Sequence, residues 1–153
     1  MSATRKQQVV YWVVTALFLV PMAGSGVPEL LFEQPASTVA TLVHLGYPLY
    51  LMRILGLAKV LGAVAIVSSR SRILKEWAYA GYAFDLLGAI ASHLIVGDGA
   101  FAAVPAIVFA LVLTSYLLWT RAAVTSSKAA REIRTHSSTG VSDQHSAPDP
   151  EQQ

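Results

Sequence analysis

The sequence predicts an all-α membrane protein, a bundle of four transmembrane helices with a short outer interfacial helix between spans one and two. Of its 153 residues 54% are hydrophobic and only 13% are charged. The charges gather at the ends of apolar segments instead of following helical faces, as they would in a soluble domain. A spanning helix needs about 20 apolar residues. Four segments meet that length: 9–27, 51–69, 77–96 and 100–119.

The first apolar segment follows Arg5 and Lys6 and so resembles a signal peptide at its start. Its apolar run is longer than the core of a typical signal peptide, and three further segments follow. We therefore expect residues 9–27 to stay in the membrane as an anchor. Residues 28–50 are too polar to cross, but an apolar stripe before Gly46 and Pro48 predicts the interfacial helix. The stripe consists of Val39, Leu42, Val43 and Leu45.

The basic residues predict the orientation, because loops on the cytoplasmic side are enriched in lysine and arginine. With both termini in the cytoplasm, nine of the eleven basic residues lie inside and the outer loops carry Glu29, Glu33 and Asp98. This indicates a multi-pass protein of the inner (plasma) membrane, with a membrane domain of residues 1–120. The cytoplasmic tail, residues 121–153, is expected to extend the last helix by two or three turns and to become disordered from His136 onward.

The composition excludes several classes of chemistry. The chain has no cysteine, which removes disulfides, thiolate nucleophiles and thiolate metal sites. Its net charge of +2 comes from residues that flank apolar segments and form no basic stripe, so nucleic acid is not an expected partner. Nucleotide-binding, zinc-protease and serine-hydrolase motifs do not occur.

Two charged residues lie deep inside apolar segments, Lys59 in the second and Asp85 in the third. Counted from the outer boundary at 1.5 Å per residue, both lie roughly 12 to 16 Å deep, near the middle of the bilayer. A lone charge there is costly, so we expect the two side chains to form a pair. Two interpretations stay open: the pair fixes the register of two helices, or it belongs to a working site.

A polar pocket is predicted around and above this pair. Small and polar residues at helical spacing, among them Gly88 and Ser92, put one face of the third segment toward the second. Closer to the outer surface, His44, Tyr47, Arg53, His93 and Asp98 are expected to line its mouth. The two histidines have no recognised ligand spacing, so neither a metal site nor haem is predicted.

Several local motifs resemble those of the DoxX-like family, small bacterial membrane proteins with four helices. They are Leu45-Gly46-Tyr47-Pro48, Gly56 with Lys59 and Gly62, Lys75-Glu76-Trp77-Ala78-Tyr79-Ala80-Gly81, Asp85, and Ser92-His93. The resemblance covers about residues 9–119 and implies four spanning helices. It implies little about activity, because most members have no established reaction. The family takes its name from a subunit of a quinone-linked thiosulfate-oxidising enzyme.

Three hypotheses follow for the function, and whether the chain is an enzyme stays open. In the first, the pocket binds a lipophilic molecule such as a quinone, or the protein supports a membrane redox complex. Its partner would then be a membrane redox protein or a second copy of this chain. In the second, the protein is a non-catalytic scaffold or assembly subunit, whose polar residues only hold helices together. In the third it is a stand-alone membrane enzyme or transporter, although the four short spans show no inverted repeat.

Overall fold

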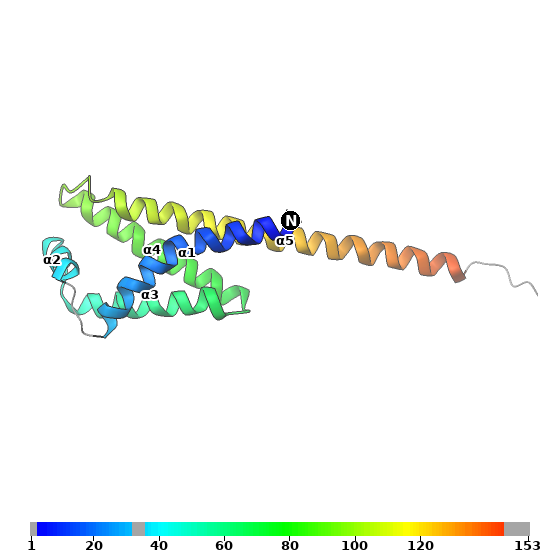
Figure 1. The fold of residues 1–153 in the computed structure, drawn as a ribbon, viewed down its shortest axis with the longest axis horizontal. Coiled ribbons are helices and arrows are strands. Elements are labelled where there is room, and N and C mark those ends of the chain that lie inside the picture. The colour runs from blue at the N-terminus through cyan, green and yellow to red at the C-terminus, as the bar shows by residue number, and fades with distance from the viewer. Residues whose placement is uncertain (1–2, 32–35, 146–153) are drawn as a thin grey trace, which may run out of the picture. The chain divides into compact units, whose positions relative to one another are not determined.

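The computed structural model of the chain describes residues 3–31 and 36–145, with side chains for residues 5–31 and 36–124. Figure 1 shows that this part of the chain is helical, as the sequence predicted, and it contains no strand. Its helices are α1 (Ala3–Leu30), α2 (Ala36–His44), α3 (Tyr50–Ser68), α4 (Arg72–Ile95) and α5 (Ala103–His145).

The chain divides into two compact units, Met1–Leu117 and Leu118–Gln153. In the second unit the backbone stays helical to His145. The prediction that helical structure is lost from His136 was therefore wrong for residues 136–145. Extending an existing helix fixes one residue for each new hydrogen bond, so residues of modest helix propensity are accommodated at its end. Residues 146–153 lie outside the described residues.

Among the residues that the structure describes, three helical segments are long and apolar enough to cross a membrane: Arg5–Leu30, Tyr50–Ser68 and Ala103–Val124. These three agree with the first, second and fourth predicted spans. Helix α4 has the length but is less apolar, because it carries Asp85, His93 and several tyrosines among its apolar residues. Its crossing of the membrane, like the interfacial position of α2, stays a prediction.

Helices α1 and α3 pack against each other at two glycines, Gly26 and Gly56. A methyl group added at Gly56 would lie 2.9 Å from the backbone oxygen of Gly26 and 2.8 Å from the Cβ atom of Glu29. Only glycine permits this approach, which is a common way for helices to associate in membranes. The crossing brings the end of α1 close to the middle of α3.

The core of the first unit lies where α1, α3, α4 and the first part of α5 meet. Phe18, Ile66 and Val112 are almost completely buried, and the ring of Phe18 lies 5.8 Å from that of Tyr82 between centroids. Many other large apolar side chains, such as Val20 and Phe84, are exposed on the outside of the helices. An apolar exterior of this extent suits a protein surrounded by lipid.

Two turns with glycine in the left-handed region shape one end of this unit. Gly46 (φ +78°) follows α2, and Gly97 (φ +87°) follows α4. Both conformations are ones that other residues rarely adopt. The last residue of α2, His44, contacts Asp98 in the connection between α4 and α5. Figure 1 shows α2 and this connection at the same end of the first unit.

Candidate functional site

Lys59 on α3 forms an ion pair with Glu29 on α1. The Lys59 Nζ atom donates to both carboxylate oxygens of Glu29, at 3.0 and 2.9 Å, and lies 3.5 Å from the Oγ atom of Ser25. The Glu29 side chain is only 4% exposed and that of Lys59 15%. The ion pair joins α1 to α3, and removal of either partner would leave a buried charge without its counter-charge.

The predicted pair of Lys59 with Asp85 was wrong, and so was the placement of Glu29 in an outer loop. Helix α1 continues through Pro28 to Leu30, which leaves Glu29 within the helix and close to α3. Within residues 5–31 and 36–124, no group forms an ion pair or hydrogen bond with the Asp85 carboxylate. Counting residues along the two helices correctly placed Lys59 and Asp85 beside the same hollows. It did not give the direction in which the side chain of Lys59 points.

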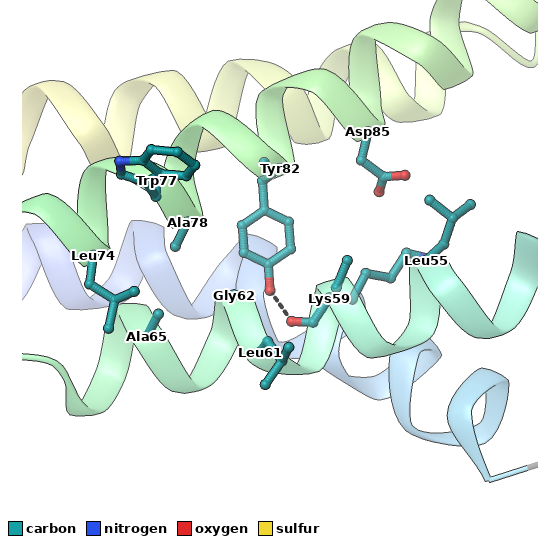
Figure 2. Close-up of a pocket in the computed structure, with 12 residues that line it drawn as sticks. Leu55, Lys59, Leu61, Gly62, Ala65, Leu74, Trp77, Ala78, Tyr82 and Asp85 are labelled. Atoms are coloured by element: carbon teal, nitrogen blue, oxygen red, sulfur yellow. Dashed lines mark hydrogen bonds between the residues drawn. The ribbon is translucent and has the colours of Figure 1, made fainter.

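Asp85 nevertheless lies in the seam between α3 and α4. Figure 2 shows its carboxylate extending from α4 toward α3, near Leu55. One helical turn away, the hydroxyl group of Tyr82 donates to the backbone oxygen of Lys59, and the Tyr82 ring packs on Gly62. Tyr82 therefore fixes the distance between α3 and α4 beside Asp85.

Two hollows open along this seam, and Leu55, Lys59 and Asp85 line both. The large hollow has a volume of about 480 Å³ and is lined by α2, α3, α4, residues of the α2–α3 connection and one residue of α1. The small hollow, about 240 Å³, is lined by α3 and α4 alone (Figure 2). Both walls are mostly apolar. The carboxylate of Asp85 is thus placed where a guest molecule in either hollow would reach it.

The predicted mouth residues gather at the end of the seam that holds α2. Tyr47, Ser92 and His93 line the large hollow, and the Tyr47 hydroxyl lies 2.7 Å from the Ser92 Oγ atom. His44 does not line it but bonds to Asp98, whose Oδ2 atom also lies 3.8 Å from the His93 Nδ1 atom. Arg53 is exposed and lines neither hollow.

The Nδ1 atom of His93 is buried and has no hydrogen-bond partner within the described residues. Its ring stacks on Phe101 at a centroid distance of 6.2 Å. A buried polar atom without a partner is uncommon in proteins. No group of three or more histidine, aspartate or glutamate side chains in the described part of the chain is arranged to hold a metal ion.

A second polar cluster, not expected from the sequence, joins α1, α4 and α5. The Ser115 Oγ atom lies 2.7 Å from the Thr15 Oγ1 atom and 2.8 Å from the Tyr79 hydroxyl, which is 3.4 Å from that of Tyr11. Thr15 and Ser115 are almost completely buried. The only sequence signal was that Thr15 and Ser115 are hydroxyl residues within long apolar runs, where such groups bond across helices.

These features define a helical membrane protein with polar side chains enclosed between apolar helices. The profile of the DoxX-like family matches residues 13–115, a range that includes Glu29, Lys59, Asp85 and His93. Because the match extends over more than half of the chain, the protein belongs to the DoxX-like family. No curated protein and no solved structure matches the chain.

Proposed function

We propose that this DoxX-like protein binds a lipophilic molecule, such as a quinone, in the large hollow between α2, α3 and α4. The observation that carries this proposal is the hollow itself, about 480 Å³ with Lys59, Asp85, Ser92 and His93 on a largely apolar wall. Binding sites for small molecules commonly enclose about 300 to 1,000 Å³ and combine an apolar lining with a few polar groups. A ligand with an apolar body and a polar head would suit such a wall.

We further propose that α4 is a fourth span, so that the hollow lies inside the bilayer. Helix α4 has 24 residues, about 36 Å at 1.5 Å per residue, which exceeds a hydrocarbon core of about 30 Å. Near its start Tyr79 bonds to Ser115 of α5, and near its end Ser92 bonds to Tyr47. Contacts at both ends support an orientation along the other spans. Four spans place both termini on one side, and the basic residues favour the cytoplasmic side of a bacterial inner membrane.

A scaffold role in a membrane complex is the second candidate, and the Glu29–Lys59 ion pair favours it. The pair lies beside the Gly26–Gly56 crossing, so Lys59 holds α1 and α3 together whether or not a ligand binds. A purely structural protein would need no more than this. The size of the large hollow favours the binding function over the scaffold, since a protein that only holds helices together gains nothing from an open seam.

The two functions separate in an extraction experiment on the full chain purified in mild detergent. Gly88 lines the large hollow, and a Cβ atom there would meet no neighbouring atom within 4 Å, so Gly88→Leu fills the hollow without a backbone clash. Gly24→Leu is the matched control, because Gly24 has equal space and lines neither hollow. Mass spectrometry of the organic extract measures bound quinones and other lipophiles.

We expect a lipophilic molecule to co-purify with the wild type and with Gly24→Leu and to be lost from Gly88→Leu. An empty wild-type preparation, or equal amounts in all three proteins, contradicts the binding function and supports the scaffold.

A further inference from the structure

We propose that Asp85 selects ligands whose head group donates a hydrogen bond, through an O–H or N–H group, over ligands whose head only accepts. The inference rests on the proposed function, because it names the chemical class of molecule that the same site takes. Among quinone-like molecules it favours the reduced quinol, which carries hydroxyl groups, over the oxidised quinone, which carries only carbonyl oxygens.

The first step is the balance of charge in the seam. Lys59 is the only lysine or arginine among the described residues that line the two hollows, whereas two carboxylates, Glu29 and Asp85, lie near it. An ammonium group has three N–H donors. Those of Lys59 have three acceptors on α1 within reach: the two carboxylate oxygens of Glu29 and the Oγ atom of Ser25. Within the described residues, Lys59 thus forms its ion pair with Glu29 and none with Asp85.

The second step is the state of Asp85 itself. In the described part of the chain no donor lies within hydrogen-bond distance of its carboxylate, which is half-buried and borders both hollows. In its ionised form the carboxylate can only accept hydrogen bonds, and leaving it without any in an apolar setting is costly. A donor on the ligand would remove that cost, whereas a carbonyl or ether oxygen at the same place would face a second acceptor.

The third step is the space on either side of Asp85. The small hollow extends from Asp85 past Trp77 toward Leu74 (Figure 2). Trp77 is eight residues before Asp85, which is about 12 Å along the helix. Apart from Lys59, Tyr82 and Asp85, its described lining is apolar or aromatic. A head group that lies in the large hollow and bonds to Asp85 therefore leaves room for an apolar chain in the small hollow, since Asp85 lines both. The ligand class is an amphiphile with a donor head and a hydrocarbon chain.

Three probes with the same chain and different heads test this inference: dodecylamine, dodecanol and dodecyl methyl ether. The full-length protein in detergent is incubated with each probe, and native mass spectrometry gives the bound fraction. A hydrogen bond to a charged group contributes about 1.5 to 3 kcal/mol, so we expect the amine, the alcohol or both to bind at least about tenfold more tightly than the ether. Tighter binding of the alcohol favours a hydroxyl head, such as that of a quinol, and tighter binding of the amine favours an ammonium head.

Two variants connect the preference to Asp85. Asp85→Asn removes the charge but keeps a carbonyl acceptor, so it should weaken the preference for donor heads, whereas Asp85→Leu removes the acceptor and should abolish it. Glu76→Gln is the control, because Glu76 is a carboxylate on the same helix that lines neither of the two hollows and pairs with Arg72. It should keep the preference.

Equal binding of the ether and the donor probes to the wild type, or an unchanged preference in both Asp85 variants, overturns the inference and leaves the proposed function standing. Failure of every probe to bind the wild type, together with an empty organic extract, overturns both. The comparison of heads on the wild type remains decisive even if an Asp85 variant does not fold.

Discussion

Lys59 and Glu29 form an ion pair beside the Gly26–Gly56 crossing of α1 and α3. The Lys59 Nζ atom lies 2.9 and 3.0 Å from the two carboxylate oxygens of Glu29. Burial makes each partner dependent on the other, since either charge alone would face an apolar environment. Because Lys59 pairs with Glu29, it forms no ion pair with Asp85. The contact that joins α1 to α3 therefore also explains why, within the described residues, the Asp85 carboxylate has no ion-pair partner.

Breaking this pair should destabilise the protein strongly. We expect Glu29→Gln to lower the free energy of unfolding by about 3 to 5 kcal/mol, because it leaves the Lys59 ammonium buried without its counter-charge. The double variant Glu29→Leu with Lys59→Met removes both charges and should recover much of the loss. Thermal unfolding in detergent measures both. A double variant less stable than the single one would show that the pair contributes more than mutual neutralisation.

The glycine crossing gives a second prediction about stability. Gly56→Ala places a methyl group 2.9 Å from the Gly26 backbone oxygen, so α1 and α3 must separate, at a cost of about 1 to 3 kcal/mol. Gly81→Ala is the control, because a methyl group there meets no neighbouring atom within 4 Å and alanine favours the helix. Unfolding transitions should shift down for the first and stay or rise for the second. Equal shifts of the unfolding transition in both variants would mean that α1 and α3 accommodate a methyl group at Gly56 without separating.

The sequence was a good guide to the helices and a poor guide to the partner of Lys59. Long apolar runs predict α1, α3 and α5, because only helices satisfy the backbone in lipid. Proline is expected to end a soluble helix, yet Pro28 lies inside α1, where apolar surroundings tolerate it. That single difference moved Glu29 from a loop into the core of the first unit.

The sequence indicated most of the residues that gather in the seam between α3 and α4, but not which side chains form pairs there. His44, Tyr47, Ser92 and His93 gather at one end of the seam because short turns fix which helix ends meet. Arg53 was grouped with them by depth alone, and it lies on an exposed face of α3. The direction of a side chain around a helix depends on which neighbours pack against it, and one sequence holds little information about that.

The hydroxyl cluster around Ser115 gives a third prediction. Ser115→Ala removes the hydroxyl that lies between Thr15 and Tyr79, and we expect a loss of about 0.6 to 2 kcal/mol, as for other hydrogen bonds between helices in membranes. Thr114→Ala is the neighbouring control, because the Thr114 hydroxyl is exposed and bonds to the backbone of its own helix at Ala110. Thermal unfolding should separate the two. If both variants unfold at the wild-type temperature, the cluster does not stabilise the bundle.

The membrane crossing of α4 decides the topology of the whole chain and can be tested directly. The chain has no native cysteine, so single substitutions can be labelled one at a time. Ser69→Cys lies between α3 and α4, and Gly99→Cys between α4 and α5. A maleimide that cannot cross membranes is added to intact bacterial cells that express each variant, with the outer membrane made permeable.

If α4 crosses the membrane, Gly99→Cys is labelled in intact cells and Ser69→Cys only after the inner membrane is disrupted. The expected difference follows from the basic residues Arg70, Arg72 and Lys75, which favour the cytoplasmic side for the first of these loops. Labelling of both variants after disruption shows that each cysteine is accessible. Should both behave alike in intact cells, α4 does not cross, the termini lie on opposite sides, and the large hollow lies at the membrane surface and not within it.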